Sequence, residues 1–196
     1  PYSDLPDSTG LNIVTRDQLA GTARLALEHG LQLCSHAIGD RANRVALDVY
    51  EQAYAEAPEP RDLRWRIEHA QHLHPDDIPR LAEIGVVAAM QPIHCTQDIV
   101  AADANWGARS RLAYAWSTLL STGAVLAFGS DAPVEPIAPL LGIHAAVTRR
   151  YLAPRAARFI SLAACFDALD APSPLSDDDA REARVKSLGV SLRDCE

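Results

Sequence analysis

Short segments that are rich in apolar residues alternate with longer stretches of helical spacing along the first 150 residues. Each short segment is bounded by Gly, Pro or polar residues, which is typical of a strand. Strands are expected at residues 31–36, 64–69, 86–91 and 124–128, the last being apolar enough for burial on both faces. Helices are expected at residues 15–30, 41–57, 75–84, 109–121 and 137–150, with an irregular connection at residues 93–108.

The first helix has the clearest end signals. Thr15 and Gln18 have the spacing of a capping box, in which each side chain binds the other's backbone N–H. Leu19 and Ala23 begin an apolar stripe, and Gly30 is placed to end the helix. The sequence therefore predicts a helix that precedes the first strand.

Strands that alternate with helices at this spacing predict an α/β fold with a parallel sheet. A doubly wound sheet and a (β/α) barrel both satisfy the pattern. A barrel needs eight strand–helix units and about 250 residues, so these units would supply its second half. Residues 151–196 differ in character, with Pro172 and Pro174 followed by an acidic run, and predict a helical or poorly ordered tail. The expected domains are thus residues 1–150 and 151–196.

The composition of the chain argues against several classes of protein. The chain has 196 residues, a net charge of −8 and scattered arginines, which argues against a nucleic-acid partner. It has no apolar run of about 18 residues and no signal-like leader, so we expect no membrane span and a cytoplasmic location. The four cysteines are widely spaced, which is typical of small buried side chains rather than of disulfides or a zinc knuckle.

Three chemically useful side chains follow three of the expected strands: His36, His69 and Asp131. Because the carboxyl ends of parallel strands meet at one edge of a sheet, these side chains are expected to converge. Two imidazoles and a carboxylate suit zinc or another divalent metal, and Asp131 could also act as a general base. The alternatives are structural histidines and an Asp131 that only caps the next helix.

Further polar residues lie near the same strand ends. Asp40 and Arg41 either begin a helix or orient substrate, and Gln91 and His94 either bind a substrate carbonyl or stabilise their loop. Glu68 is expected to pair with Arg64 or Arg66 rather than to take part in catalysis. We expect His72 and His74 to be solvated, and His144 and Cys95 to pack in the interior.

Four motifs together resemble the amidohydrolase superfamily, and most closely amidohydrolase family 3, which includes enzymes like N-substituted formamide deformylase. The motifs, all within residues 1–150, are His36-Ala-Ile-Gly-Asp-Arg-Ala42, Arg66-Ile-Glu-His-Ala-Gln71, Met90-Gln-Pro-Ile-His94 and Phe128-Gly-Ser-Asp-Ala-Pro-Val134. Each motif alone is modest evidence for this family, but the order and spacing of the four motifs are specific to it. The resemblance implies a metal-dependent hydrolase of C–N bonds in small amides, built on a (β/α)₈ barrel.

The same resemblance implies residue roles. His36 and His69 would bind metal, and Asp131 would bind metal and accept and return the proton of the hydrolytic water. The expected strands would be the fifth to eighth of the barrel, and the family's His-x-His pair and carboxylated lysine would precede residue 1. We therefore expect either a missing N-terminal half or self-association that covers the open sheet edges. The alternative is a truncated, catalytically silent α/β domain.

Overall fold

The computed structural model describes residues 1–57 and 62–150. The predicted tail at residues 151–196, together with Cys165 and Cys195, lies outside them. The chain divides into two compact units. In the described residues, one unit comprises residues 1–57, 62–90 and 99–128, and the other comprises residues 91–98 and 129–150.

The first unit contains a parallel sheet. Its strands are β1 (Cys34–Ala37), β2 (Arg66–His69), β3 (Val87–Met90) and β4 (Leu126–Phe128), and they pair in chain order. Every pairing is parallel, so all strands end at the same edge, as the sequence predicted. The α/β class and the parallel sheet are therefore confirmed.

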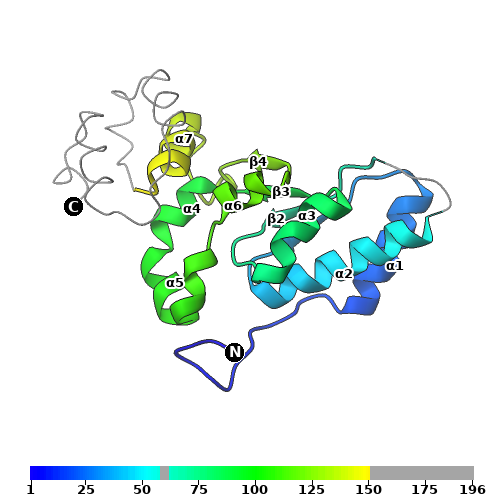
Figure 1. Ribbon diagram of the computed structural model, residues 1–196, viewed down its shortest axis with the longest axis horizontal. Helices are drawn as coiled ribbons and strands as arrows, with labels where there is room; N and C mark the ends of the chain where they lie inside the picture. Colours follow the sequence, from blue (N-terminus) through cyan, green and yellow to red (C-terminus); the bar gives the residue numbers. More distant parts are fainter. Residues whose placement is uncertain (58–61, 151–196) are drawn as a thin grey trace. The chain divides into compact units, whose positions relative to one another are not determined.

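Helices follow the first two strands. The helix α1 (Arg16–Glu28) precedes β1, α2 (Asp40–Glu56) follows β1, and η1 (Pro75–Asp77) with α3 (Ile78–Ile84) follows β2. The Thr15–Gln18 capping box forms in both directions, which confirms the predicted start of α1. The helices α2 and α3 lie side by side (Figure 1).

The connection between β3 and β4 differs from the prediction. Residues 93–108 are not irregular, because they contain most of α4 (Pro92–Gln97) and α5 (Ile99–Trp106). The single helix expected at residues 109–121 is also wrong: η2 (Gly107–Leu112) and α6 (Trp116–Ser121) stand in its place. Ala113 is extended and Tyr114 has a left-handed φ of 54°, so helical backbone cannot continue through them. The last described helix, α7 (Pro139–Thr148), matches the expected one at residues 137–150.

The strand β4 is less buried than its apolar sequence predicted. Ala127 is exposed and Phe128 is 49% exposed in the described residues. The expectation of a strand buried on both faces is therefore wrong for β4. No helix in the described ranges is long and apolar enough to cross a membrane.

An aromatic cluster forms the centre of the first unit. Trp65 is fully buried, its ring meets Tyr50 edge to face at 4.9 Å between centroids, and it stacks on Tyr54 at 4.6 Å. The indole Nε1 donates to the carbonyl of Leu31 at 2.9 Å. Burial raises the pKa of Tyr50, whose hydroxyl lies 2.7 Å from Ser35 Oγ in β1. This cluster joins α2 to the strands that carry the candidate site.

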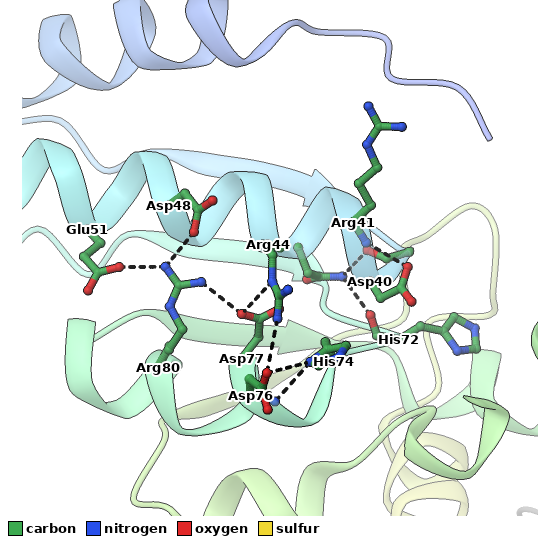
Figure 2. A network of polar contacts seen from close by, with 12 residues as sticks. Asp40, Arg41, Arg44, Asp48, Glu51, His72, His74, Asp76, Asp77 and Arg80 are labelled. Atoms are coloured by element: carbon green, nitrogen blue, oxygen red, sulfur yellow. Dashed lines mark hydrogen bonds and ion pairs between the residues drawn. The ribbon is translucent and has the colours of Figure 1, made fainter. Parts of the chain in front are cut away.

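A polar network joins α2 to α3 (Figure 2). The carboxylate of Asp77 is only 1% exposed and receives Arg44 Nε and Arg80 Nη1, each at 2.9 Å. Arg80 also binds Asp48 at 2.8 Å and Glu51 at 2.6 Å on α2. A buried carboxylate with two guanidinium partners is well compensated, which explains its position.

We expect Asp77→Asn to lower the free energy of unfolding by about 1–3 kcal/mol, because it leaves partly buried donors without their charged acceptor. Urea unfolding measures the loss. Asp76→Asn is the matched control, because Asp76 is 78% exposed, and it should cost less than about 0.5 kcal/mol. Equal losses for the two variants would contradict a structural role for the network.

Candidate functional site

His36 and His69 lie together at the ends of neighbouring strands. Their ring centroids are 4.4 Å apart and their planes meet at 70°. His36 is exposed, whereas His69 is 6% exposed. The convergence of these two imidazoles, which the sequence predicted, is present in the first unit.

An unusual backbone brings the two rings together. In the strand register, His36 pairs with Glu68 and Ala37 pairs with His69, so strict alternation would place the two histidines on opposite faces. His69 instead has a left-handed φ of 77°, and the next residue, Ala70, has a φ of 44°. This conformation costs about 1–3 kcal/mol for a non-glycine residue, and residues that adopt it are found preferentially at functional sites.

Asp131 lies in the loop after β4, separated from the end of the strand at Phe128 by Gly129 and Ser130. It also has a left-handed φ, 53°, and its side chain is 41% exposed. Because α7 begins only at Pro139, with Ala138 as its N-cap, Asp131 does not cap that helix. The structural alternative for Asp131 is therefore excluded.

His94 lies between two carboxylates within the second unit. Its Nε2 atom is 3.5 Å from Asp131 Oδ2, and its Nδ1 atom is 3.7 Å from Glu135 Oε1. The side chains of His94 and Glu135 are only 11% and 12% exposed. Sequence reasoning named His94 but missed Glu135. The only indication in the sequence was that Glu135 is a second acidic residue, which follows Asp131 in the same loop.

The residues that were predicted to contact substrate differ in their burial and in their hydrogen-bond partners. Asp40 receives Arg109 Nη1 at 2.7 Å and the backbone N–H of Arg41 at 2.8 Å, so its carboxylate already has structural partners. The exposed Arg41 extends to Thr9 Oγ1 at 3.3 Å. Gln91, the N-cap residue of α4, is buried. A substrate role for each of them stays a prediction.

Other sequence-based expectations have mixed outcomes. Glu68 pairs with Arg66, as expected. His72 is not solvated: it is 3% exposed, and its ring stacks on Trp106 at 3.9 Å, because the intervening connection folds over it. His74 is 45% exposed, which agrees with the prediction. His144 and Cys95 are buried as expected, but Cys34 is exposed and not a core residue.

The chemistry of the donors matches a divalent transition metal. Imidazole nitrogens and carboxylate oxygens are zinc ligands, and the paired rings of His36 and His69 supply two of them from adjacent strands. Asp131 keeps part of its carboxylate accessible. The residue types present therefore suit such an ion.

The buried His144 predicts a pH dependence of stability. Burial lowers its pKa, so the folded chain keeps the ring neutral where the unfolded chain protonates it. The unfolded state then binds more protons, and the free energy of unfolding should fall as the pH drops below about 6.5 through the lowered pKa. Urea unfolding from pH 8 to 5 measures the slope. His144→Gln should reduce this slope, and an equal slope in the variant and in the unsubstituted chain would contradict the assignment.

The described strands form a parallel sheet in an α/β protein, and His36 and His69 lie near the carboxyl ends of two adjacent strands. The chain belongs to the amidohydrolase family, whose model matches residues 1–171.

Two curated relatives are similar to most of the chain. Protein LONG AFTER FAR-RED 3 of Arabidopsis thaliana is 41% identical over 150 residues, which are 76% of this chain and 26% of the relative. Putative amidohydrolase YtcJ of Bacillus subtilis (strain 168) is 36% identical over 156 residues, 76% of this chain and 28% of the relative. The chain thus spans about a quarter of the length of these relatives.

Two solved structures share the fold. An uncharacterized metal-dependent hydrolase from Pyrococcus furiosus has a TM-score of 0.68 and 34% identity, over 86% of this chain and 33% of that one. An uncharacterized metal-dependent hydrolase from Pyrococcus horikoshii OT3 has a TM-score of 0.69 and 31% identity, over 86% of this chain and 34% of that one. This chain matches about a third of each structure.

Proposed function

We propose that this chain forms part of a metal-dependent hydrolase that cleaves C–N bonds in small amides or related compounds. The observation that carries the proposal is the pair of imidazoles at the ends of adjacent parallel strands, one of them held in strained backbone. Family membership and the metal-dependent hydrolases among the similar structures support it. The substrate class is the one that the family resemblance implies.

His36, His69 and Asp131 are the proposed metal ligands, and zinc is the proposed ion. Bound zinc lowers the pKa of water and polarises a carbonyl oxygen. Asp131 acts as general base: its carboxylate takes a proton from the attacking water and returns it to the leaving nitrogen. Asp40, Arg41, Gln91 and His94 are the proposed substrate contacts.

The open edges of the sheet support a further part of this proposal. In the described residues, no strand pairs with the outer edge of β1 or β4. Val125, which precedes β4, is 62% exposed, and Phe128, the last residue of β4, is 49% exposed. Unpaired strand edges attract another strand. We propose that additional barrel strands cover them, from the remainder of a longer protein or from a second copy of the chain.

Zinc binding tests the ligand assignment. His36→Asn and His69→Asn should each weaken zinc affinity at least about 10-fold, because even residues that only support a ligand have effects of that size. Asparagine also tolerates the left-handed backbone of position 69. Isothermal titration with zinc measures the affinity, and His74→Asn is the matched control.

The outcomes separate two functions. Affinity lost at positions 36 and 69 but kept at position 74, together with amide hydrolysis, supports the hydrolase. Zinc binding without turnover in the presence of the remaining barrel strands would favour a catalytically silent domain. Unchanged zinc affinity in both site variants would overturn the proposed ligands.

A further inference from the structure

The chain stays buried where β2 ends and the next loop begins, over residues 69–73. Backbone polar groups in a buried loop need partners within the protein, because water does not reach them. The N–H of His72 donates to the carbonyl of Ile38, in the loop after β1, at 2.9 Å. The carbonyl of Gln71 accepts from the N–H of Tyr114 at 2.8 Å. The carbonyl of His72 needs a donor as well.

The side chain of Asn43 supplies that donor. Asn43 lies in the first turn of α2, is fully buried, and has its Nδ2 atom 3.3 Å from the carbonyl of His72. The same Nδ2 atom is 3.3, 3.2 and 2.9 Å from the carbonyls of Ala37, Ile38 and Gly39. Its two hydrogens are therefore shared among four carbonyl oxygens. This environment also fixes the orientation of the amide, because a flipped side chain would direct an oxygen at four acceptors.

The acceptor end of the same amide has the opposite environment. Oδ1 of Asn43 is buried and receives no hydrogen bond from the part of the chain that the structure describes. An unpaired buried acceptor is unfavourable, and an apolar side chain of similar shape would avoid it. Such a side chain would also take this donor from the carbonyl of His72. The donor end of Asn43 is thus the part of the side chain that the fold uses.

The four carbonyls belong to the end of β1 and to the loops after β1 and β2. The first of them comes one residue after His36, and the last belongs to His72, three residues after His69. Between the two histidines of β2 and its loop lies the left-handed backbone of His69 and Ala70, with φ of 77° and 44°. Unfavourable backbone of this kind persists only where the surrounding contacts hold it. Asn43 holds the residues just beyond it against the end of the neighbouring strand.

We propose that Asn43 is a positioning residue, which holds the loops after β1 and β2 together and so maintains the left-handed turn that brings the ring of His69 to His36. Its importance for activity rests on the proposed function, in which these two imidazoles bind the metal. Asn43 acts through backbone carbonyls, so it is neither a metal ligand nor a catalytic residue. Without its donor, the two loops separate and the paired rings separate with them.

Native-state hydrogen exchange of the full, metal-free chain tests the contact between the loops. The amide of His72 reports this contact, and the amide of Val87, which donates to the carbonyl of Trp65 at 2.9 Å, reports the opening of the sheet. In the unsubstituted chain, both amides should be strongly protected. Asn43→Leu removes the donor at similar shape and should lower the protection of His72 about 10-fold more than that of Val87, the effect of one lost buried hydrogen bond.

Val49→Ala is the matched control, because Val49 is buried on the same helix and its truncation affects stability alone. It should lower the protection of both amides by the same factor. If Asn43→Leu does not fold, Asn43→Ala removes the same donor without adding bulk and is measured in the same way.

The ring pair provides a second readout, which general destabilisation does not move. The edge-to-face rings of His36 and His69, 4.4 Å apart between centroids, should shift each other's carbon-bound ring protons in the proton spectrum. Asn43→Leu should move these signals toward the position of the exposed His74, whereas Val49→Ala should leave them unchanged. The His36→Asn and His69→Asn variants assign the signals by their disappearance.

Three results would overturn the inference: an unprotected His72 amide in the unsubstituted chain, an equal loss of protection at His72 and Val87 in the Asn43 variant, or unchanged ring signals in that variant. Each can occur while zinc still binds through His36 and His69. Conversely, unchanged zinc affinity in His36→Asn and His69→Asn would contradict the proposed function and leave these metal-free measurements as they are. The two proposals therefore fail separately.

Discussion

Asp131→Asn is expected to lower the rate of amide hydrolysis about 10²–10⁴-fold, the usual contribution of a positioned general base. Asparagine keeps the shape of the side chain and tolerates the left-handed φ of 53°, so the fold should persist. The amide cannot take up the proton of the attacking water. The expected loss is therefore mainly in kcat, measured by release of the amine product from a protein that also contains the proposed additional strands.

The control for this variant is Asp17→Asn, which removes one negative charge from the exposed first turn of α1. It should leave turnover unchanged. Zinc affinity is measured alongside, because a variant that merely loses metal would recover activity at high zinc concentration. A full rate for Asp131→Asn with zinc bound would remove Asp131 from the mechanism.

Trp65→Ala is expected to lower the free energy of unfolding by about 3–5 kcal/mol, the usual cost of truncating a large buried aromatic residue. The variant leaves a cavity between Tyr50 and Tyr54 and removes the donor to the Leu31 carbonyl. Because the aromatic cluster packs α2 against β1 and β2, the loss should also disorder the ends of these strands. Urea unfolding followed by circular dichroism measures the change.

Trp106→Ala is the matched control, because it makes the same truncation at a partly exposed tryptophan. It removes the stacking partner of His72 but opens no enclosed cavity, so it should cost less than half as much. Equal costs at the two positions would show that Trp65 is not the centre of the core.

The succession of strands and helices was predictable because it depends on local patterns. The capping box of α1 and the left-handed Gly85 that ends α3 involve neighbouring residues only, and both act as the sequence indicates. Tyr114 is different, since nothing in its sequence signals a left-handed φ that interrupts the expected helix. The burial of His72 under Trp106 also depends on a contact between residues far apart in the chain.

The candidate site divides in the same way. The pattern of strand ends located His36, His69, His94 and Asp131, since a strand's end is a local property. Glu135 could not be assigned, because its relation to His94 depends on how the loop after β4 folds against α4 within the second unit.

The sequence by itself determined the α/β class, the parallel direction of the strands and the residue types available for chemistry. These properties follow from the spacing of apolar residues and the positions of turn residues, which are local features of the chain. Only the tertiary structure decided which face each side chain takes. Strict alternation would have separated His36 from His69, and the left-handed backbone at His69 brings their rings together. Such backbone is unfavourable locally and persists only where the surrounding packing compensates its cost.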